Sequence, residues 1–147
     1  MKYLEFDKQE LVNLEYSLNR EILSTNRAGG YFSTTIVLCN TRKYHGLMVL
    51  PLEGFDREPH VLLSSVDDTI IQRGQSFNLG IHRYPGIYDP RGHKYIIDFD
   101  YEPTPTITYR VGGVVLKKEL LFVHNEEQFM IRYTLVDAHS PTKIRIK

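Results

Sequence analysis

The second half of the chain alternates apolar and polar residues with the period of two that is typical of half-buried β-strands. In the segment 129–136, the apolar residues at every second position are Phe129, Ile131, Tyr133 and Leu135. In the segment 114–123, the same period places Lys118 on one face with Val114, Leu116, Leu120 and Phe122. Gly112-Gly113 precedes this segment and supplies the two positive-φ positions of a tight hairpin. These patterns predict consecutive antiparallel strands.

Further strands are predicted where short apolar or β-branched runs are bounded by Gly, Pro, Asp or Asn. The predicted ranges are 21–25, 32–39, 47–52, 60–66, 69–72, 76–81, 93–101, 106–111 and 142–147. A short helical turn is expected at 8–13, where Asp7 and Glu10 form a capping pattern. Residues 84–92 contain two prolines and two glycines, and we expect a long surface loop there. The short reversals between strands indicate meander-like connections in an all-β chain.

The length of 147 residues is that of one ordinary domain, which can bury about 68–70% of its unfolded surface. The strand pattern of 142–147 runs to the last residue without a terminating signal. Natural domains seldom end on an alternating strand. We therefore expect one domain, 1–147, that is incomplete because its chain is cut in the middle of a sheet.

Charge and composition exclude several classes of binding partner and indicate a cellular compartment. Eighteen Lys and Arg balance eighteen Asp and Glu, which gives no electrostatic argument for nucleic acid or an anionic membrane, so neither is expected as a partner. No apolar run approaches the roughly 18 residues of a membrane helix, and the amino terminus lacks the apolar core of a signal peptide. The single cysteine, Cys39, excludes an internal disulfide and fits a reducing compartment. We expect a cytoplasmic protein with Cys39 as a small buried side chain.

Catalytic motifs are weak in this sequence. Cleavage of a glycosidic bond requires two carboxylates, and the candidate pairs are Asp67 with Asp68, Asp98 with Asp100, and Glu126 with Glu127. We interpret these pairs as turn residues or as the solvent-facing side of a strand. The six histidines lack the spacing of a metal site, and neither a Gly-x-Ser-x-Gly elbow nor a phosphate-binding loop is present. No cofactor or metal is expected.

The segments 26–31 (Asn-Arg-Ala-Gly-Gly-Tyr) and 40–46 (Asn-Thr-Arg-Lys-Tyr-His-Gly) concentrate the polar and aromatic side chains. Sugars are recognised by planar hydrogen-bonding groups and by aromatic faces that cover the hydrogens of the sugar ring. The segment 40–46 and the tyrosine-rich segment 84–95 supply both kinds of group. The alternative interpretation is a polar turn that fixes two strands, or docks another domain, through Arg42 and His45. Composition leaves both interpretations open.

Several short motifs occur in an order that resembles that of a known protein family. The segments 21–26, 29–31, 40–47 and 61–65, followed by 108–114 and 131–135, resemble the N-terminal domain of bacterial and archaeal glycogen debranching enzymes over nearly the whole chain. That resemblance implies an antiparallel β-sandwich of the supersandwich type, placed ahead of an (α/α) toroid that carries the catalytic acids and is absent from this chain. It also implies removal of α-1,6 branch points by an enzyme with 4-α-glucanotransferase and amylo-α-1,6-glucosidase activities.

On this resemblance we expect a non-catalytic part of a debranching enzyme of glycogen catabolism, which supports the catalytic domain and lines its glucan cleft. The expected partners are glycogen or malto-oligosaccharide and the enzyme's own C-terminal catalytic domain. The residues expected to bind substrate or dock that domain are Asn26, Tyr31, Asn40, Arg42, Tyr44 and His45. The alternatives are a stand-alone glucan-binding sandwich and a purely structural domain. The chain departs from the family at Arg27-Ala28, where members often have glycine and leucine.

Overall fold

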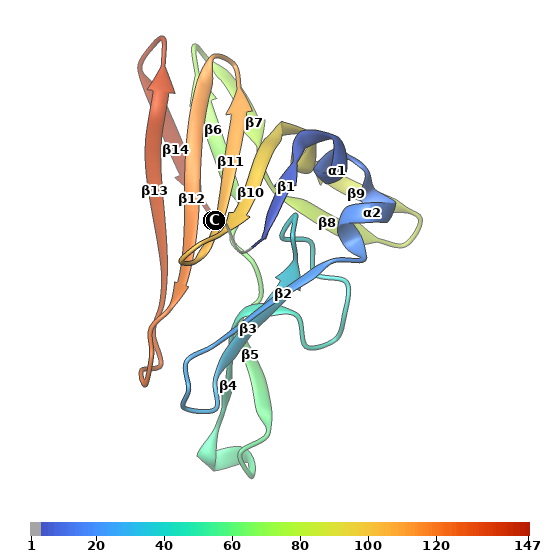
Figure 1. Cartoon of the computed structure of the whole chain (residues 1–147), viewed down its shortest axis with the longest axis vertical. Helices are drawn as coiled ribbons and strands as arrows, with labels where there is room; N and C mark the ends of the chain where they lie inside the picture. The colour runs from blue at the N-terminus through green and yellow to red at the C-terminus, as the bar shows by residue number, and fades with distance from the viewer. Residues whose placement is uncertain (1–3) are drawn as a thin grey trace.

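The computed structural model describes residues 4–147, which form mainly antiparallel strands (Figure 1). The strands are β1 (Glu5–Asp7), β2 (Glu21–Thr25), β3 (Tyr31–Thr35), β4 (Gly46–Pro51), β5 (Pro59–Leu63), β6 (Asp68–Gln72), β7 (Gln75–Asn78), β8 (Ile81–Tyr84), β9 (Ile87–Arg91), β10 (Ile96–Tyr101), β11 (Pro105–Val111), β12 (Val114–Phe122), β13 (Phe129–Ala138) and β14 (Thr142–Ile146). The helical segments are α1 (Lys8–Val12), α2 (Leu14–Leu18) and the 3₁₀ turns η1 (Glu53–Phe55) and η2 (Gly92–Tyr95). Within 4–147, no helix is long and apolar enough to cross a membrane.

The strands form four sheets. A five-stranded sheet has the order β1-β10-β11-β12-β13, and a three-stranded sheet, β14-β6-β7, lies behind it in Figure 1. The four-stranded sheet β2-β3-β4-β5 extends below these two layers, and the hairpin β8-β9 lies beside the helices. The predicted all-β, sandwich-like fold is confirmed.

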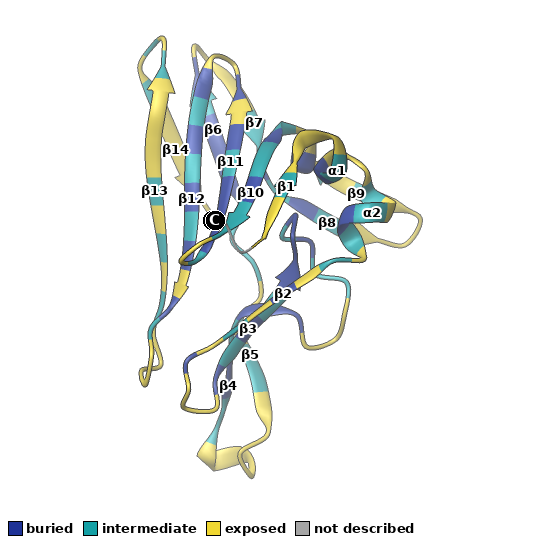
Figure 2. Ribbon diagram, viewed as in Figure 1, coloured by how far each residue is buried: buried dark blue, intermediate teal, exposed yellow. Residues whose placement is uncertain are grey.

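Strand β12 shows how the sequence pattern produces the core. Its residues alternate between buried and more exposed positions (Figure 2). Lys118 lies at a buried position, on the face predicted for it. Gly112 and Gly113 have φ values of 57° and 78° in the turn that precedes it, which confirms the predicted hairpin. In β13 the alternation ends near Leu135, which is 53% exposed, where a register shift interrupts the pairing with β12.

The predicted long loop at 84–92 is wrong. Residues 81–91 form the hairpin β8-β9, with Pro85-Gly86 in its turn. Proline fixes the φ of the first turn position, and Gly86 takes the positive φ of 77° at the second. Pro90 is tolerated inside β9 because β8-β9 is a two-stranded sheet, so β9 has a free edge.

The predicted strand 32–39 is too long, because β3 ends at Thr35. The Thr35 hydroxyl donates to the Cys39 carbonyl at 2.9 Å and accepts from the Cys39 amide at 3.0 Å, which closes a turn. Leu38 has a φ of 61° within this turn. The prediction of Cys39 as a small buried side chain is confirmed, and burial raises its thiol pKa to about 11.

Three other boundaries differ from the sequence predictions. The strand predicted at 93–101 begins only at Ile96, because residues 92–95 form η2. The first residue of η2, Gly92, lies so close to Leu79 that an added Cβ would be 2.1 Å from the Leu79 carbonyl carbon. Gly80 and its neighbour divide the predicted strand 76–81 between β7 and β8, and β5 ends three residues early. The capped turn at 8–13 is confirmed as α1, with Asp7 and Glu10 forming a capping box. Strand β1 and helix α2 were not predicted.

A buried ion pair connects the two layers of the sandwich. Lys118 of β12 donates from Nζ to Oδ2 of Asp68 in β6, and both residues are at most 2% exposed. The Tyr133 hydroxyl of β13 donates to the other carboxylate oxygen, Oδ1, at 2.6 Å. Burial, together with this hydrogen bond, raises the pKa of Tyr133, which keeps the donor protonated.

A buried histidine connects η2 to α1. His93 is 2% exposed, and it forms a hydrogen bond with the Val12 backbone. Burial, aided by Arg91 and Lys94, lowers the pKa of His93 to about 4. The ring is therefore neutral in the folded protein at neutral pH.

We expect Lys118→Met to destabilise the protein by about 3–5 kcal/mol, because it leaves the Asp68 carboxylate buried without its cation. Urea unfolding followed by circular dichroism measures the change. The double variant Lys118→Met/Asp68→Leu should recover most of the loss, since no unpaired charge remains. A single variant as stable as the double variant would contradict this account.

We expect acid to weaken the fold through His93. Its folded pKa of about 4 lies below the unfolded value, so the unfolded chain binds a proton first as the pH falls below about 6.5. The contribution of neutral His93 to the free energy of unfolding is fully present above about pH 6.5. It is lost as the pH falls toward 4, and the total loss is about 3 kcal/mol. Unfolding free energies of the wild type and His93→Gln across this range should differ in slope. Parallel pH profiles would exclude His93 as the cause.

Candidate functional site

Four of the six predicted site residues line one shallow groove on the β2-β3 face. They are Tyr31, Arg42, Tyr44 and His45. The groove has a volume of about 550 Å³, and its other lining residues are Glu21, Leu23, Thr25, Ser33 and Lys43. We call this feature the tyrosine groove.

Strand pairing places these side chains together. In the antiparallel register, Leu23 lies opposite Ser33 and Thr25 lies opposite Tyr31. Because alternate residues of a strand point to the same face, Glu21 joins Leu23 and Thr25 on this side. The segment 41–45 then folds back over the strands, with the His45 amide donating to the Arg42 carbonyl at 3.1 Å.

A carboxylate shared by two basic side chains lies at the end of the groove. Glu21 Oε1 is 2.5 Å from Arg42 Nε and 3.4 Å from His45 Nε2. The Arg42 side chain is 72% exposed, whereas that of His45 is only 3% exposed. His45 Nδ1 accepts from the Thr41 amide at 3.0 Å, which assigns the neutral-ring proton to Nε2, on the side of Glu21.

The two tyrosines supply the aromatic surface. The Tyr31 hydroxyl donates to the Tyr44 carbonyl at 3.4 Å, and Tyr44 is 44% exposed. Burial, with the nearby Tyr44 as the smaller cause, raises the pKa of Tyr31, so its hydroxyl remains a donor at neutral pH. Lys43 Nζ lies 5.1 Å from the centre of the Tyr44 ring. The groove thus combines aromatic rings with a carboxylate and cationic donors.

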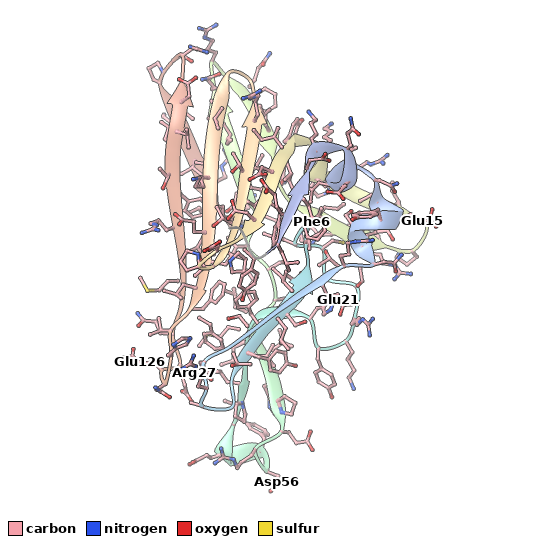
Figure 3. All side chains as sticks on the ribbon, in the orientation of Figure 1. Phe6, Glu15, Glu21, Arg27, Asp56 and Glu126 are labelled. Atoms are coloured by element: carbon pink, nitrogen blue, oxygen red, sulfur yellow. The ribbon has the colours of Figure 1, made fainter. Side chains whose placement is uncertain are left out.

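Asn26 does not line the tyrosine groove. Its side chain is fully buried, where Oδ1 accepts from the Ala28 and Gly30 amides at 2.9 and 2.8 Å. Nδ2 donates to the Glu126 carbonyl at 2.9 Å, which ties this turn to the one between β12 and β13. Figure 3 shows Arg27 and Glu126 near each other at this junction. In this structure Asn26 organises a turn, and its role in binding stays a prediction.

Asn40 also lies outside the groove and holds its supporting loop. Its Nδ2 donates to the Ser64 carbonyl at 2.9 Å, and its Oδ1 accepts from the Thr34 hydroxyl at 2.8 Å. These bonds fix the start of the 40–46 segment between β3 and the segment after β5. Any influence of Asn40 on a ligand in the groove therefore acts through the position of this loop.

Sequence reasoning missed Glu21 as a site residue. It occupies the first position of a strand, and a charged residue there is normally a solvent-facing residue. The available signal was its position two and four residues before Leu23 and Thr25, which places all three on the face that adjoins Tyr31.

The interpretation of Asp67-Asp68 as paired turn residues is wrong for Asp68, which is buried in the ion pair with Lys118. Asp67 instead bonds His82 Nε2 at 2.8 Å through Oδ1. The two carboxylates thus have different partners, and neither lines the tyrosine groove. No group of three or more acidic, histidine or cysteine side chains placed to hold a metal occurs within residues 4–147.

A match to a protein family agrees with the resemblance that the order of the motifs indicated. The model of the family described as "Glycogen debranching enzyme N terminal" matches residues 20–147. No curated protein and no solved structure matches the chain. The family match extends from the residue before β2 to the end of the chain and includes every residue of the tyrosine groove. The chain therefore belongs to the glycogen debranching enzyme N-terminal family.

Proposed function

We propose that this chain is the non-catalytic N-terminal part of a cytoplasmic glycogen debranching enzyme, and that its tyrosine groove binds the glucan. The enzyme acts on α-1,6 branch points of glycogen during glycogen catabolism. The observation that carries the proposal is the placement of Tyr31, Tyr44 and the Glu21–Arg42 pair in one open groove.

The chemistry of the groove suits a sugar polymer. Exposed aromatic rings cover the apolar faces of sugar rings, and a carboxylate accepts hydrogen bonds from hydroxyl groups. Arg42 uses Nε for Glu21, so its terminal nitrogens can donate to the ligand. A shallow groove exposes both ends of a bound segment, which a long glucan requires.

The same groove gives a reason to assign catalysis elsewhere. Glu21 is the one carboxylate among its described lining residues. Hydrolysis of a glycosidic bond uses a pair of carboxyl groups, one on each side of the bond. We assign that pair to the enzyme's C-terminal catalytic domain, with this domain holding the glucan beside it.

One observation supports docking of that catalytic domain as a second candidate role. Leu23 is 61% exposed in the same groove, beside Tyr44 at 44%. Neighbouring exposed apolar side chains are typical of a surface that contacts another protein domain. Binding measurements on the isolated chain separate the two roles, because a docking surface would not bind free oligosaccharide.

We expect Tyr44→Ala to weaken binding of maltoheptaose by about fivefold to tenfold, since stacking on an aromatic ring contributes about 1 kcal/mol. Isothermal titration calorimetry provides the measurement. Phe55→Ala is the control, because Phe55 is likewise an exposed aromatic residue, at 61% against 44% for Tyr44, but lies at the β4-β5 tip, outside the groove. Equal losses in both variants, or no saturable binding by the wild type, would contradict a self-sufficient glucan site.

We expect Arg42→Ala to reduce the turnover of a branched glucan by the whole enzyme while leaving the thermal stability of the protein almost unchanged. An exposed ion pair contributes about 0–1 kcal/mol, so the unfolding midpoint should barely move. His45→Ala should lower both, because it removes a buried ring that holds the Thr41 amide. Normal turnover by both variants would exclude this loop from the glucan site.

A further inference from the structure

A second, basic hollow lies next to the tyrosine groove. It has a volume of about 520 Å³ and is formed by the segment 40–42 and the turn of the β8-β9 hairpin. Its lining residues are Asn40, Thr41, Arg42, Arg83, Tyr84, Pro85 and Gly86, and none of them is acidic. We call it the arginine hollow.

The two arginines differ in how their charge is compensated. Arg42 is paired with Glu21, whereas Arg83 has no ion-pair partner within the part of the chain that is described. Glu15 and Glu21 line an adjoining hollow that both arginines also border, so nearby negative charge approaches from that side. The lining of the arginine hollow itself has two cationic side chains and no acidic one, and the charge of Arg83 is not compensated by an ion pair among the described residues.

The walls of this hollow are held in place without a ligand. Asn40 is fixed by its bonds to Thr34 and Ser64. On the opposite wall, Pro85-Gly86 forms the tight turn of the hairpin, with Gly86 at a φ of 77°. A site with preset walls pays less ordering entropy on binding.

We propose that the arginine hollow binds the phosphoryl group of a phosphorylated sugar. The planar guanidinium groups of Arg42 and Arg83 present paired donors that match phosphate oxygens. The hydroxyl of Thr41, which precedes Arg42 in the wall formed by 40–42, adds a neutral donor. Tyr84 is 53% exposed, which leaves an aromatic surface for the attached sugar ring.

Arg42 extends this argument to a glucan, which rests on the proposed function of the tyrosine groove. Arg42 lines both the groove and the hollow. A glucan lying in the groove and carrying a phosphomonoester on a neighbouring residue would place its neutral rings on Tyr31 and Tyr44. Its phosphoryl group would then face Arg83.

The test compares three probes by calorimetry at low salt: inorganic phosphate, glucose 6-phosphate and neutral maltotriose. We expect the wild type to bind glucose 6-phosphate more tightly than phosphate, and Arg83→Gln to weaken both by about tenfold or more. Maltotriose binding should not change. Arg110→Gln is the control for total charge, because Arg110 is exposed on β11 and lies outside both hollows.

Arg83→Lys keeps the charge but removes the planar pair of donors, so its affinity for glucose 6-phosphate should lie between those of the wild type and Arg83→Gln. Circular dichroism and thermal unfolding confirm that the variants are folded. Absence of phosphate-dependent binding in the wild type would overturn the proposal. Equal affinities for glucose 6-phosphate in the wild type, Arg83→Gln and Arg110→Gln would do the same.

A phosphorylated malto-oligosaccharide distinguishes the source of the phosphoryl group. If it binds more tightly than both glucose 6-phosphate and the matching neutral oligosaccharide, the phosphate is carried on the glucan. Preference for glucose 6-phosphate supports a free sugar phosphate in the hollow. If phosphate ligands bind through Arg83 but neutral oligosaccharides do not bind at all, the glucan groove fails while the arginine hollow stands.

Discussion

The contact between Lys118, Asp68 and Tyr133 fixes how the two layers of the sandwich meet. A lysine on an otherwise apolar strand face is costly to bury unless a carboxylate compensates it, and that carboxylate must lie at one position of the facing sheet. Asp68 lies at this position as the first residue of β6. Apolar contacts are not directional, whereas a shift between the two sheets would leave the charges of Lys118 and Asp68 buried without compensation.

The position of Asp68 determines that of the neighbouring segments. Asp67, the preceding residue, bonds His82 at the start of the β8-β9 hairpin, and this hairpin carries Arg83 and Tyr84. Ser64 lies three residues before Asp67, and its carbonyl oxygen accepts a hydrogen bond from Asn40 Nδ2. This bond holds the loop that carries Arg42 and His45. The ion pair inside the sandwich is thus linked, through short covalent and hydrogen-bonded steps, to both walls of the arginine hollow and to one wall of the tyrosine groove.

These links explain which features could be predicted from the sequence. The alternation in β12 and the Gly112-Gly113 turn are local, so the pattern was sufficient. Pro85-Gly86 was assigned to a long loop, because prolines and glycines are typical of both loops and hairpin turns, and only the pairing of Tyr84 with Ile87 decides between them. Asp68 was misinterpreted because its partner, Lys118, is 50 residues away.

The site was predicted in part for the same reason. Tyr31, Arg42, Tyr44 and His45 meet in one groove because two neighbouring segments of the chain form it. The amides of Asn26 and Asn40 have the same chemistry as ligand-binding amides, but in both residues Nδ2 donates to a carbonyl far along the chain and Oδ1 accepts from a nearby residue. Glu21 and Arg83 were overlooked because each lies on a strand that the string 40–46 meets only after folding.

Two acid–base contacts of the described chain, Asp68–Lys118 and Glu21–Arg42, differ in burial, and burial determines what each can do. Asp68 and Lys118 are almost completely buried, so separating them would leave uncompensated charges in the interior and the pair cannot rearrange. Arg42 is 72% exposed beside Glu21, where water weakens the attraction to about 1 kcal/mol or less. A ligand hydroxyl or phosphoryl group can therefore replace part of the Glu21–Arg42 contact at little cost. The buried pair cannot lose one partner without leaving the other charge uncompensated, so it is unsuited to binding, whereas the pair at the groove is suited to it because it contributes so little to stability.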